Sequence, residues 1–158
     1  MQRWKSKLQV RRVIMKKVVK FGGSSLANAE QFQKVGDIIR SDESRRYVVP
    51  SAPGKRFDED IKVTDMLYGC YDAASKGEDI TEKINAIKAR YYEIIKGLGL
   101  SLSLEEEFKK IDEDFRAQAG IQYAASRGEF LNGKIMAAYL GYDFVDAATV
   151  IRFDKDGN

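Results

Sequence analysis

The sequence Met-Lys-Lys-Val-Val-Lys-Phe-Gly-Gly-Ser-Ser-Leu, residues 15–26, decides the fold prediction. Its β-branched and aromatic residues predict a buried parallel strand over residues 16–21. Gly22 and Gly23 follow this strand, and residues without a Cβ let the chain turn sharply and expose its backbone N–H groups. Apolar residues at helical spacing begin soon afterwards. A strand, a glycine turn and a helix in this order bring a backbone close to a phosphate group.

This turn has two interpretations from the residues alone. Its N–H groups and the N-terminus of a following helix offer partial positive charge to an anion, and Lys20 adds a full charge from the strand end. The alternative is a strand-to-helix connection that requires glycine only for its geometry. The sequence has neither the spacing of a Walker A motif nor that of a dinucleotide fingerprint. The turn alone therefore predicts an anion-friendly backbone and no particular ligand.

The composition is that of a soluble globular domain. The chain has 158 residues, 44% of them hydrophobic and 32% charged, which fits one domain. No run reaches the ~20 apolar residues of a membrane-spanning helix, and the N-terminus lacks a signal-peptide pattern. With one cysteine and no histidine, an intrachain disulfide and histidine-ligated metal sites are excluded. We expect a cytoplasmic protein with Cys70 in its core.

The positive charge is concentrated at the N-terminus. Residues 1–29 contain eight Lys or Arg and no acidic residue, which leaves 19 basic and 24 acidic residues in the rest of the chain. A basic arm can bind nucleic acid or anionic lipid. Nucleic-acid binding also calls for aromatic residues among the charges, and Trp4 is the only one among residues 1–14. We therefore favour an extension without a nucleic-acid or membrane partner.

Beyond the first strand, apolar periodicity and turn residues predict alternating helices and strands. A capping pair starts a helix at Asn28, and Tyr47–Ser51 is the second strand; Thr64 and Ser103 are expected to cap later helices. A third strand is expected over Tyr142–Val145. Further helices are predicted over residues 81–96 and 121–140, with a break expected at Gly128, and a fourth strand over residues 150–153. This alternation predicts an α/β fold of three layers, α/β/α, around a mostly parallel sheet.

Four stretches in the same order resemble those of aspartate kinases in the amino acid kinase family. They are Lys20–Ser25, Val48–Gly54, Lys62–Leu67 and Ser126–Leu131, the last followed by Phe144–Ala147. The resemblance covers residues 15–158. It implies that they are the N-terminal, amino-acid-substrate portion of an amino acid kinase domain, without its nucleotide-binding half. Residues 1–14 match nothing in the family and are expected to be a basic extension, disordered or not native, with Met15 as an alternative start.

The resemblance implies roles for the residues around the glycine turn. Lys20 is the expected catalytic residue, in contact with the transferring phosphoryl group. Gly22 and Gly23 are expected to present amides to the phosphates of ATP, and Ser24 a hydroxyl. A kinase acting on a carboxylate moves a phosphoryl group between two anions, so positioning and positive charge do most of the work. ATP is the implied co-substrate, and Mg²⁺ is expected with it.

Three further residues are implied to bind L-aspartate. Glu129 is expected to hold the ammonium group of the substrate, because a carboxylate is the natural partner of an ammonium. Ser51 and Thr64 match positions that contact the amino acid. Without the resemblance, Glu129 is a helix residue stabilised by the helix dipole, and Ser51 and Thr64 are capping residues.

The implied reaction is transfer of the γ-phosphoryl group of ATP to the β-carboxylate of L-aspartate, in lysine, threonine and methionine biosynthesis. The full-length enzyme is expected to be a homo-oligomer, and fusion to homoserine dehydrogenase stays open. Two alternatives remain: another amino acid kinase, acting on glutamate or N-acetylglutamate, and a non-catalytic substrate-binding or subunit-association fragment. Because the later half of the family domain supplies most of the nucleotide pocket, we expect this chain alone to lack useful kinase activity.

Overall fold

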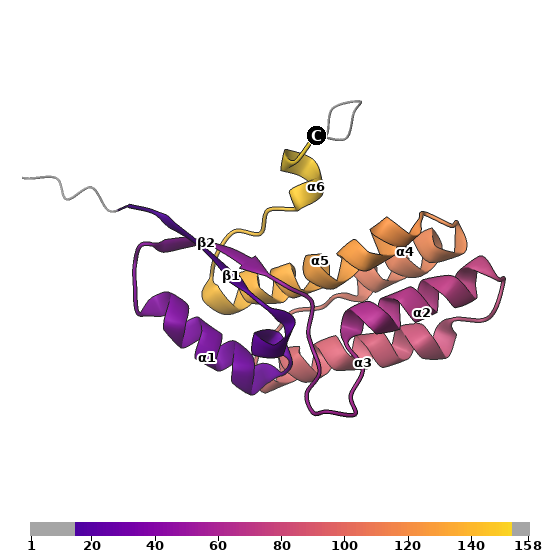
Figure 1. Ribbon diagram of the computed structural model, residues 1–158, viewed down its shortest axis with the longest axis horizontal. Coiled ribbons are helices and arrows are strands. Elements are labelled where there is room, and N and C mark those ends of the chain that lie inside the picture. The colour runs from indigo at the N-terminus through magenta and orange to yellow at the C-terminus, as the bar shows by residue number, and fades with distance from the viewer. Residues whose placement is uncertain (1–14, 153–158) are drawn as a thin grey trace, which may run out of the picture.

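The structure, a computed structural model, describes residues 15–152; the extension predicted for residues 1–14 lies outside them. Two strands and six α-helices follow one another within this range, together with one short 3₁₀ helix (Figure 1). In chain order they are β1 (Lys17–Phe21), the 3₁₀ helix η1 (Gly23–Leu26), α1 (Ala29–Arg40), β2 (Arg45–Pro50), α2 (Val63–Ser75), α3 (Thr81–Gly97), α4 (Glu105–Arg116), α5 (Ile121–Leu140) and α6 (Ala147–Val150).

The sheet consists of β1 and β2, which pair in parallel. Val18 lies opposite Tyr47, and Phe21 lies opposite Pro50 at the carboxyl ends of both strands. Pro50 is the last residue of β2, as expected for a residue that cannot donate to a ladder. Since both strands run the same way, the two segments that follow them start at the same edge of the sheet.

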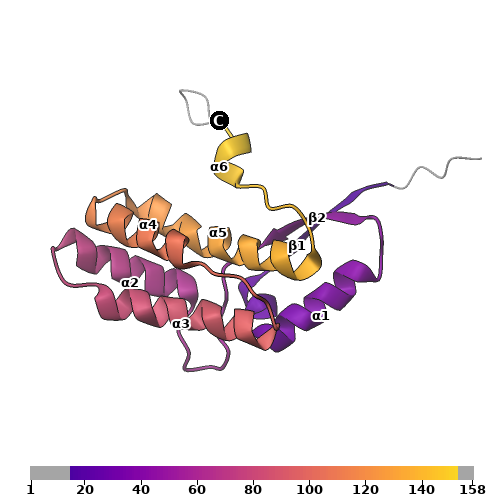
Figure 2. The ribbon, with the colours of Figure 1, turned by 180° about the vertical axis from the view of Figure 1, so that it is seen from behind.

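The two faces of the sheet differ. Val19, Phe21 and Val48 pack against the hydrophobic core, whereas Val18 and Tyr47 are 67% and 53% exposed. The helices therefore cover one face; α5 lies behind the strands in Figure 1 and in front of them in Figure 2. Helices packed on a parallel sheet confirm the predicted α/β class.

The helices α2 to α5 lie side by side along the long axis of the molecule (Figure 1). Their shared core holds large aromatic side chains in edge-to-face and tilted contacts: the ring centroids of Tyr71 and Phe115 are 5.5 Å apart, and those of Tyr91 and Phe108 are 6.0 Å apart. Such pairs add about 0.5–1.5 kcal/mol to the burial of their area. The bundle thus provides a packed surface for the loops at the carboxyl ends of the strands.

Several predicted helix ends are confirmed. The Asn28 side chain accepts a hydrogen bond from the Gln31 N–H at 3.0 Å and caps α1. Gly141, with φ 68°, is the left-handed C-cap of α5. The break expected at Gly128 is absent, because α5 continues through it. Instead, a Cβ on Gly128 would lie 2.6 Å from the Ala52 Cβ, so this glycine permits a close approach.

Two predicted caps are wrong. The N-cap of α2 is Lys62, and Thr64 lies inside the helix without capping it. The Val63 N–H donates to Pro53 O at 3.1 Å, so a loop carbonyl satisfies the first amide of the helix, and this amide needs no side-chain cap. The N-cap of α4 is Leu104 rather than Ser103, although the Ser103 Oγ accepts a long hydrogen bond, 3.4 Å, from the Glu105 N–H at the start of the helix.

The third predicted strand is also wrong. Residues 142–146 contain no strand, and Val150 ends the short helix α6 rather than starting a fourth strand; Phe153 lies outside the described residues. The Asp146 side chain accepts a hydrogen bond from the Ala148 N–H and caps α6. Apolar, β-branched residues form a strand only where a neighbouring strand supplies ladder hydrogen bonds. Here the Asp146 cap starts a short helix instead.

Candidate functional site

The segments that follow β1 and β2 are joined to each other by backbone hydrogen bonds. The Ser51 N–H donates to Phe21 O at 3.0 Å, and further along the Gly54 N–H donates to Gly23 O at 2.8 Å. The glycine turn after β1 and the Ser-Ala-Pro-Gly loop after β2 therefore form one continuous backbone surface. The parallel pairing of β1 and β2 places both segments at one edge of the sheet, and the sequence did not predict this direct bond between them.

The two glycines of the turn have different roles. A Cβ on Gly23 would lie 2.8 Å from Ala52 O, so only glycine allows this contact, whereas a Cβ on Gly22 would meet nothing within 4 Å. Gly22 has φ −78° and ψ 167°, an extended conformation open to any residue. The turn is therefore made by the four-residue 3₁₀ helix η1 rather than by unusual glycine angles. The α-helix that follows begins only at Ala29.

Lys20 and Ser24 are exposed. Lys20 is the penultimate residue of β1 and lies between Val19 and Phe21, which pack on the core. Because side chains alternate along a strand, Lys20 shares the open face of the sheet with Val18. Its ammonium group is thus available to an anion beside the turn.

Glu129 lies in the third turn of α5, beside the loop after β2. Its Oε1 accepts a hydrogen bond from the Ala52 N–H at 3.4 Å, and its side chain is otherwise exposed. Burial, followed by the nearby Glu129 carboxylate, raises the pKa of Tyr91 well above its usual range. Tyr91 therefore stays a neutral donor, and its hydroxyl bonds to Gly128 O at 2.8 Å. This bond fixes the backbone next to Glu129.

Ser51 and Thr64 lie at the two ends of the loop after β2. Ser51 follows the last residue of β2 and is half-buried. Thr64 is the second residue of α2, whose first N–H is bonded to Pro53 O of the same loop. The loop thus connects both predicted substrate contacts to the glycine turn.

Asn132 is a site residue that the sequence prediction missed. It is completely buried, and its Nδ2 donates to Ser51 O at 2.6 Å. Its Oδ1 is buried without a hydrogen-bond partner among the described residues. The available signal was a polar residue within the apolar stripe of α5, three positions after Glu129. A buried amide of this kind holds the end of β2 in place.

An apolar groove of about 600 Å³ lies beside the site, between β2, α5 and the segment after α5. Tyr47 and Val49 of β2 line it with Phe130 and Met136 of α5, and Glu129 lies at its edge. Lys20, the glycine turn and Thr64 are not among its lining residues. Apart from Glu129, which also lines the groove, the polar site is therefore the exposed surface at the strand ends.

Other kinds of site find little support in residues 15–152. No group of three His, Cys, Asp or Glu side chains in this range could hold a metal ion. No helix in the same range has the length and apolar character needed to cross a membrane. Cys70 is a buried free thiol, and burial raises its pKa to about 11. It is a core residue, as predicted.

Known proteins are similar to this chain in sequence and in fold. An aspartokinase 3 of Bacillus subtilis is 39% identical over 142 residues, which cover 85% of this chain and 31% of that protein. The crystal structure of aspartate kinase from Clostridium acetobutylicum superposes with a TM-score of 0.85 at 47% identity, over 89% of this chain and 32% of that one. The structure of Escherichia coli aspartokinase III in complex with aspartate and ADP gives a TM-score of 0.63 at 26% identity, over 78% and 28%.

The matches cover most of this chain but only part of each relative. The chain spans about a third of the length of these relatives. The profile described as "Amino acid kinase family" matches residues 15–157, nearly the whole chain. This chain therefore belongs to the amino acid kinase family.

Proposed function

We propose that this chain is the amino-acid-substrate portion of an aspartate kinase. In the whole enzyme, the γ-phosphoryl group of ATP passes to the β-carboxylate of L-aspartate. The observation that carries the proposal is the joining of the two strand-end segments beside a free carboxylate. Gly54 N–H bonds to Gly23 O at 2.8 Å, and Ala52 N–H approaches Glu129 Oε1 at 3.4 Å. A phosphate-binding turn and an ammonium-binding carboxylate are thereby adjacent to one loop.

On the phosphate side, Lys20 is the proposed catalytic residue. Its exposed ammonium neutralises charge on the transferring phosphoryl group, which is the main requirement of this chemistry. Gly22 has open space on its α-carbon, so a phosphate of ATP can approach the backbone amides of Gly22 and Gly23. Ser24 is exposed and adds a hydroxyl donor. Residues 15–152 contain no acidic cluster for a metal, so in this proposal Mg²⁺ enters on the nucleotide.

On the substrate side, Glu129 is proposed to hold the ammonium group of L-aspartate. Its side chain is exposed and makes one long hydrogen bond, so a cationic ligand can replace the Ala52 amide as its partner. Ser51 and Thr64 are proposed to contact the same amino acid, with the Ser51 backbone fixed by Asn132. The E. coli relative whose structure holds aspartate and ADP supports this pair of ligands.

The remaining parts of the proposal follow from the aspartate kinase relatives. They are a homo-oligomeric whole enzyme, a cytoplasmic location and a role in lysine and threonine biosynthesis. Since the chain spans about a third of these relatives, we expect it to bind L-aspartate without turning it over. An amino acid kinase for glutamate or N-acetylglutamate is the competing substrate assignment.

The test combines a hydroxylamine-trap assay with NMR titrations of the 158-residue chain. MgATP is supplied with L-aspartate, L-glutamate or N-acetyl-L-glutamate, and acyl hydroxamate is measured. In parallel, amide shifts are followed in the wild type, in Glu129→Gln and in the matched control Glu113→Gln, an exposed glutamate of α4. We expect shifts at Ser51 and Ala52 with L-aspartate, lost in Glu129→Gln and retained in the control.

Three other outcomes have distinct meanings. Hydroxamate formed only from L-aspartate supports the substrate and contradicts the expected inactivity of the chain alone. Hydroxamate or shifts only with glutamate or N-acetylglutamate overturn the substrate assignment. The absence of shifts with every substrate overturns the proposal that this chain carries the amino acid site.

A further inference from the structure

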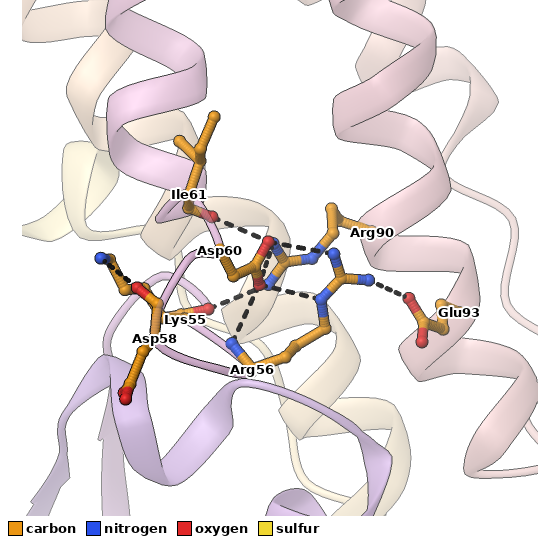
Figure 3. Close-up of polar contacts among 8 residues, drawn as sticks. Lys55, Arg56, Asp58, Asp60, Ile61, Arg90 and Glu93 are labelled. Atoms are coloured by element: carbon orange, nitrogen blue, oxygen red, sulfur yellow. Dashed lines mark hydrogen bonds and ion pairs between the residues drawn. The ribbon is translucent and has the colours of Figure 1, made fainter.

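The loop after β2 is closed at its base by one arginine from the helical bundle. Arg90 extends from α3, and its Nη2 donates to Gly54 O at 2.9 Å. Its Nη1 donates to Ile61 O at 3.0 Å (Figure 3). These two carbonyls lie at opposite ends of the loop. The guanidinium thus joins the start of the loop to its end, across its base.

An ion cluster fixes the position of this guanidinium. Asp60 Oδ2 lies 2.9 Å from Arg90 Nη1 and 2.9 Å from Arg56 Nε, and Arg56 also bonds Glu93 at 2.8 Å (Figure 3). Hydrogen bonds from Arg56, chiefly, hold the pKa of Asp60 well below its usual range despite burial. Asp60 is therefore a carboxylate near neutral pH, and it neutralises Arg90.

The burial of Arg90 makes this arrangement specific to arginine. The residue is 5% exposed, and its Nε is buried without a partner among the described residues. A buried charge is retained only where it is paired and hydrogen-bonded. The planar guanidinium bonds two carbonyls and a carboxylate at once, whereas a lysine ammonium is a compact point charge that does not have this reach.

A single residue, Gly54, connects Arg90 to the glycine turn. Gly54, whose carbonyl accepts from Arg90, donates its N–H to Gly23 O at 2.8 Å. The two backbones are in close contact there, since a Cβ on Gly54 would lie 2.6 Å from the Gly23 carbonyl carbon. A displacement of Gly54 therefore removes the support of the turn after β1.

We propose that Arg90 is a positioning residue, which clamps the base of the loop so that Gly54 holds the glycine turn in its phosphate-binding shape. This inference deepens the proposed function, on which its catalytic meaning rests. The hydrogen bonds of Arg90 within residues 15–152 go to Asp60, Ile61 and Gly54 and not to Lys20 or the turn itself, so it acts through the Gly54 backbone. The clamp would couple the helical bundle to the turn that handles the transferring phosphoryl group.

The test compares Arg90→Lys, Arg90→Met and the matched control Arg56→Met in the 158-residue chain. Arg56 shares Asp60 with Arg90 but makes no bond to Gly54. Amide hydrogen exchange of Gly54 is measured by NMR against core amides of α3 and α5, together with urea unfolding. We expect Arg90→Lys to retain most of the stability and yet to speed exchange of the Gly54 amide about tenfold or more, because local opening is separable from global unfolding. Arg56→Met should leave that amide protected.

The outcomes separate positioning from a merely structural charge. If lysine restores both stability and Gly54 protection, or if Arg56→Met exposes Gly54 equally, then Arg90 serves only to neutralise Asp60 and the proposal is wrong. Faster exchange at Gly54 and in the core by the same factor also overturns it, because that is global unfolding. A titration with MgADP then follows the Gly22 and Gly23 amides: weaker shifts in Arg90→Lys than in wild type extend the inference to phosphate binding. If wild type shows no shifts while Gly54 loses protection only in Arg90 variants, the clamp stands and the proposed phosphate site fails.

Discussion

The loop over residues 52–62 and the segment over residues 142–152 are both irregular, and they differ in how they are held. In the loop, the carbonyls of Pro53, Gly54 and Ile61 all accept hydrogen bonds from other elements, two of them from Arg90. In the segment, the backbone bonds are short-range, such as Ile151 N–H to Ala147 O. The loop is therefore fixed by distant partners and the segment by its own neighbours.

The exposure of apolar side chains does not separate the two regions. Both regions carry exposed ones: Phe57 in the loop is 57% exposed, and Val145 and Val150 in the segment are 63% and 64% exposed. The segment nevertheless touches the bundle through Tyr142, which packs against the hydrophobic core, and through Phe144, which meets the Phe130 ring edge-to-face at 5.5 Å. The partners of the backbone carbonyls, and not the exposure of apolar side chains, thus distinguish the two regions.

The largest expected effect comes from removing the anion at the centre of the loop. Asp60→Asn leaves Arg90 buried without its carboxylate, and breaking one side of a buried ion pair costs about 3–5 kcal/mol. Urea unfolding at pH 7 measures the loss. Asp72→Asn is the control, since Asp72 forms an exposed pair with Lys76, and such pairs contribute about 0–1 kcal/mol. Equal losses in the two variants would mean that the buried Asp60–Arg90 pair stabilises the fold no more than the exposed Asp72–Lys76 pair.

The same carboxylate predicts a dependence of stability on pH. The pKa of Asp60 is lowered in the folded chain, chiefly by the hydrogen bond from Arg56, below the value of about 3.9 expected when unfolded. Its stabilising contribution is therefore complete above about pH 5 and declines as the pH falls through 4 and below. The difference in unfolding free energy between wild type and Asp60→Asn should shrink between pH 5 and pH 3. A constant difference over that range would show that the charge of Asp60 is not what stabilises the loop.

The next largest effect on stability is expected from the close contact between the Gly54 and Gly23 backbones. Gly54→Ala introduces a Cβ 2.6 Å from the Gly23 carbonyl carbon, and such overpacking costs about 1–3 kcal/mol. Gly22→Ala is the control, because its α-carbon faces open space at φ −78°, so alanine there is neutral or stabilises by about 0.4–1 kcal/mol. Thermal or urea unfolding of both variants makes the comparison. If Gly22→Ala is the more damaging, the two glycines have been assigned the wrong roles.

The sequence predicted one of these two regions better than the other. The strand ends near residues 21 and 50 follow from β-branched runs and a proline, and the predicted parallel sheet brings the two ends to one edge. Its clamp was not predictable, because Arg90 lies 36 residues from Gly54 and looks like any charged residue of an amphipathic helix. Asn132 was missed for the same reason: its partner, Ser51 O, is 81 residues away. Local patterns carry no information on such pairs.

In the segment after α5, the local pattern predicted an element that the structure does not contain. Its aromatic and β-branched residues predicted a strand over residues 142–145, since the pattern describes side chains suited to a pleated surface. A strand also needs a neighbouring backbone in register, and that is a property of the rest of the fold. The pattern alone predicted an anion-friendly turn with Lys20 beside it. The specific roles of the candidate site residues came through resemblance, and their roles in phosphate and aspartate binding remain predictions.

The smallest expected effect tests whether the segment is truly held only by its neighbours. Ile151 is 56% exposed, so Ile151→Ser should change the free energy of unfolding by no more than about 0.5 kcal/mol. Ile135→Ala, a truncation of a buried side chain of α5, should cost about 2–5 kcal/mol. Urea unfolding at pH 7 gives both values. A loss above 1 kcal/mol for Ile151→Ser would show that residues 142–152 pack on the rest of the fold. The segment and the loop would then both be held by distant parts of the chain, and the contrast between them would be wrong.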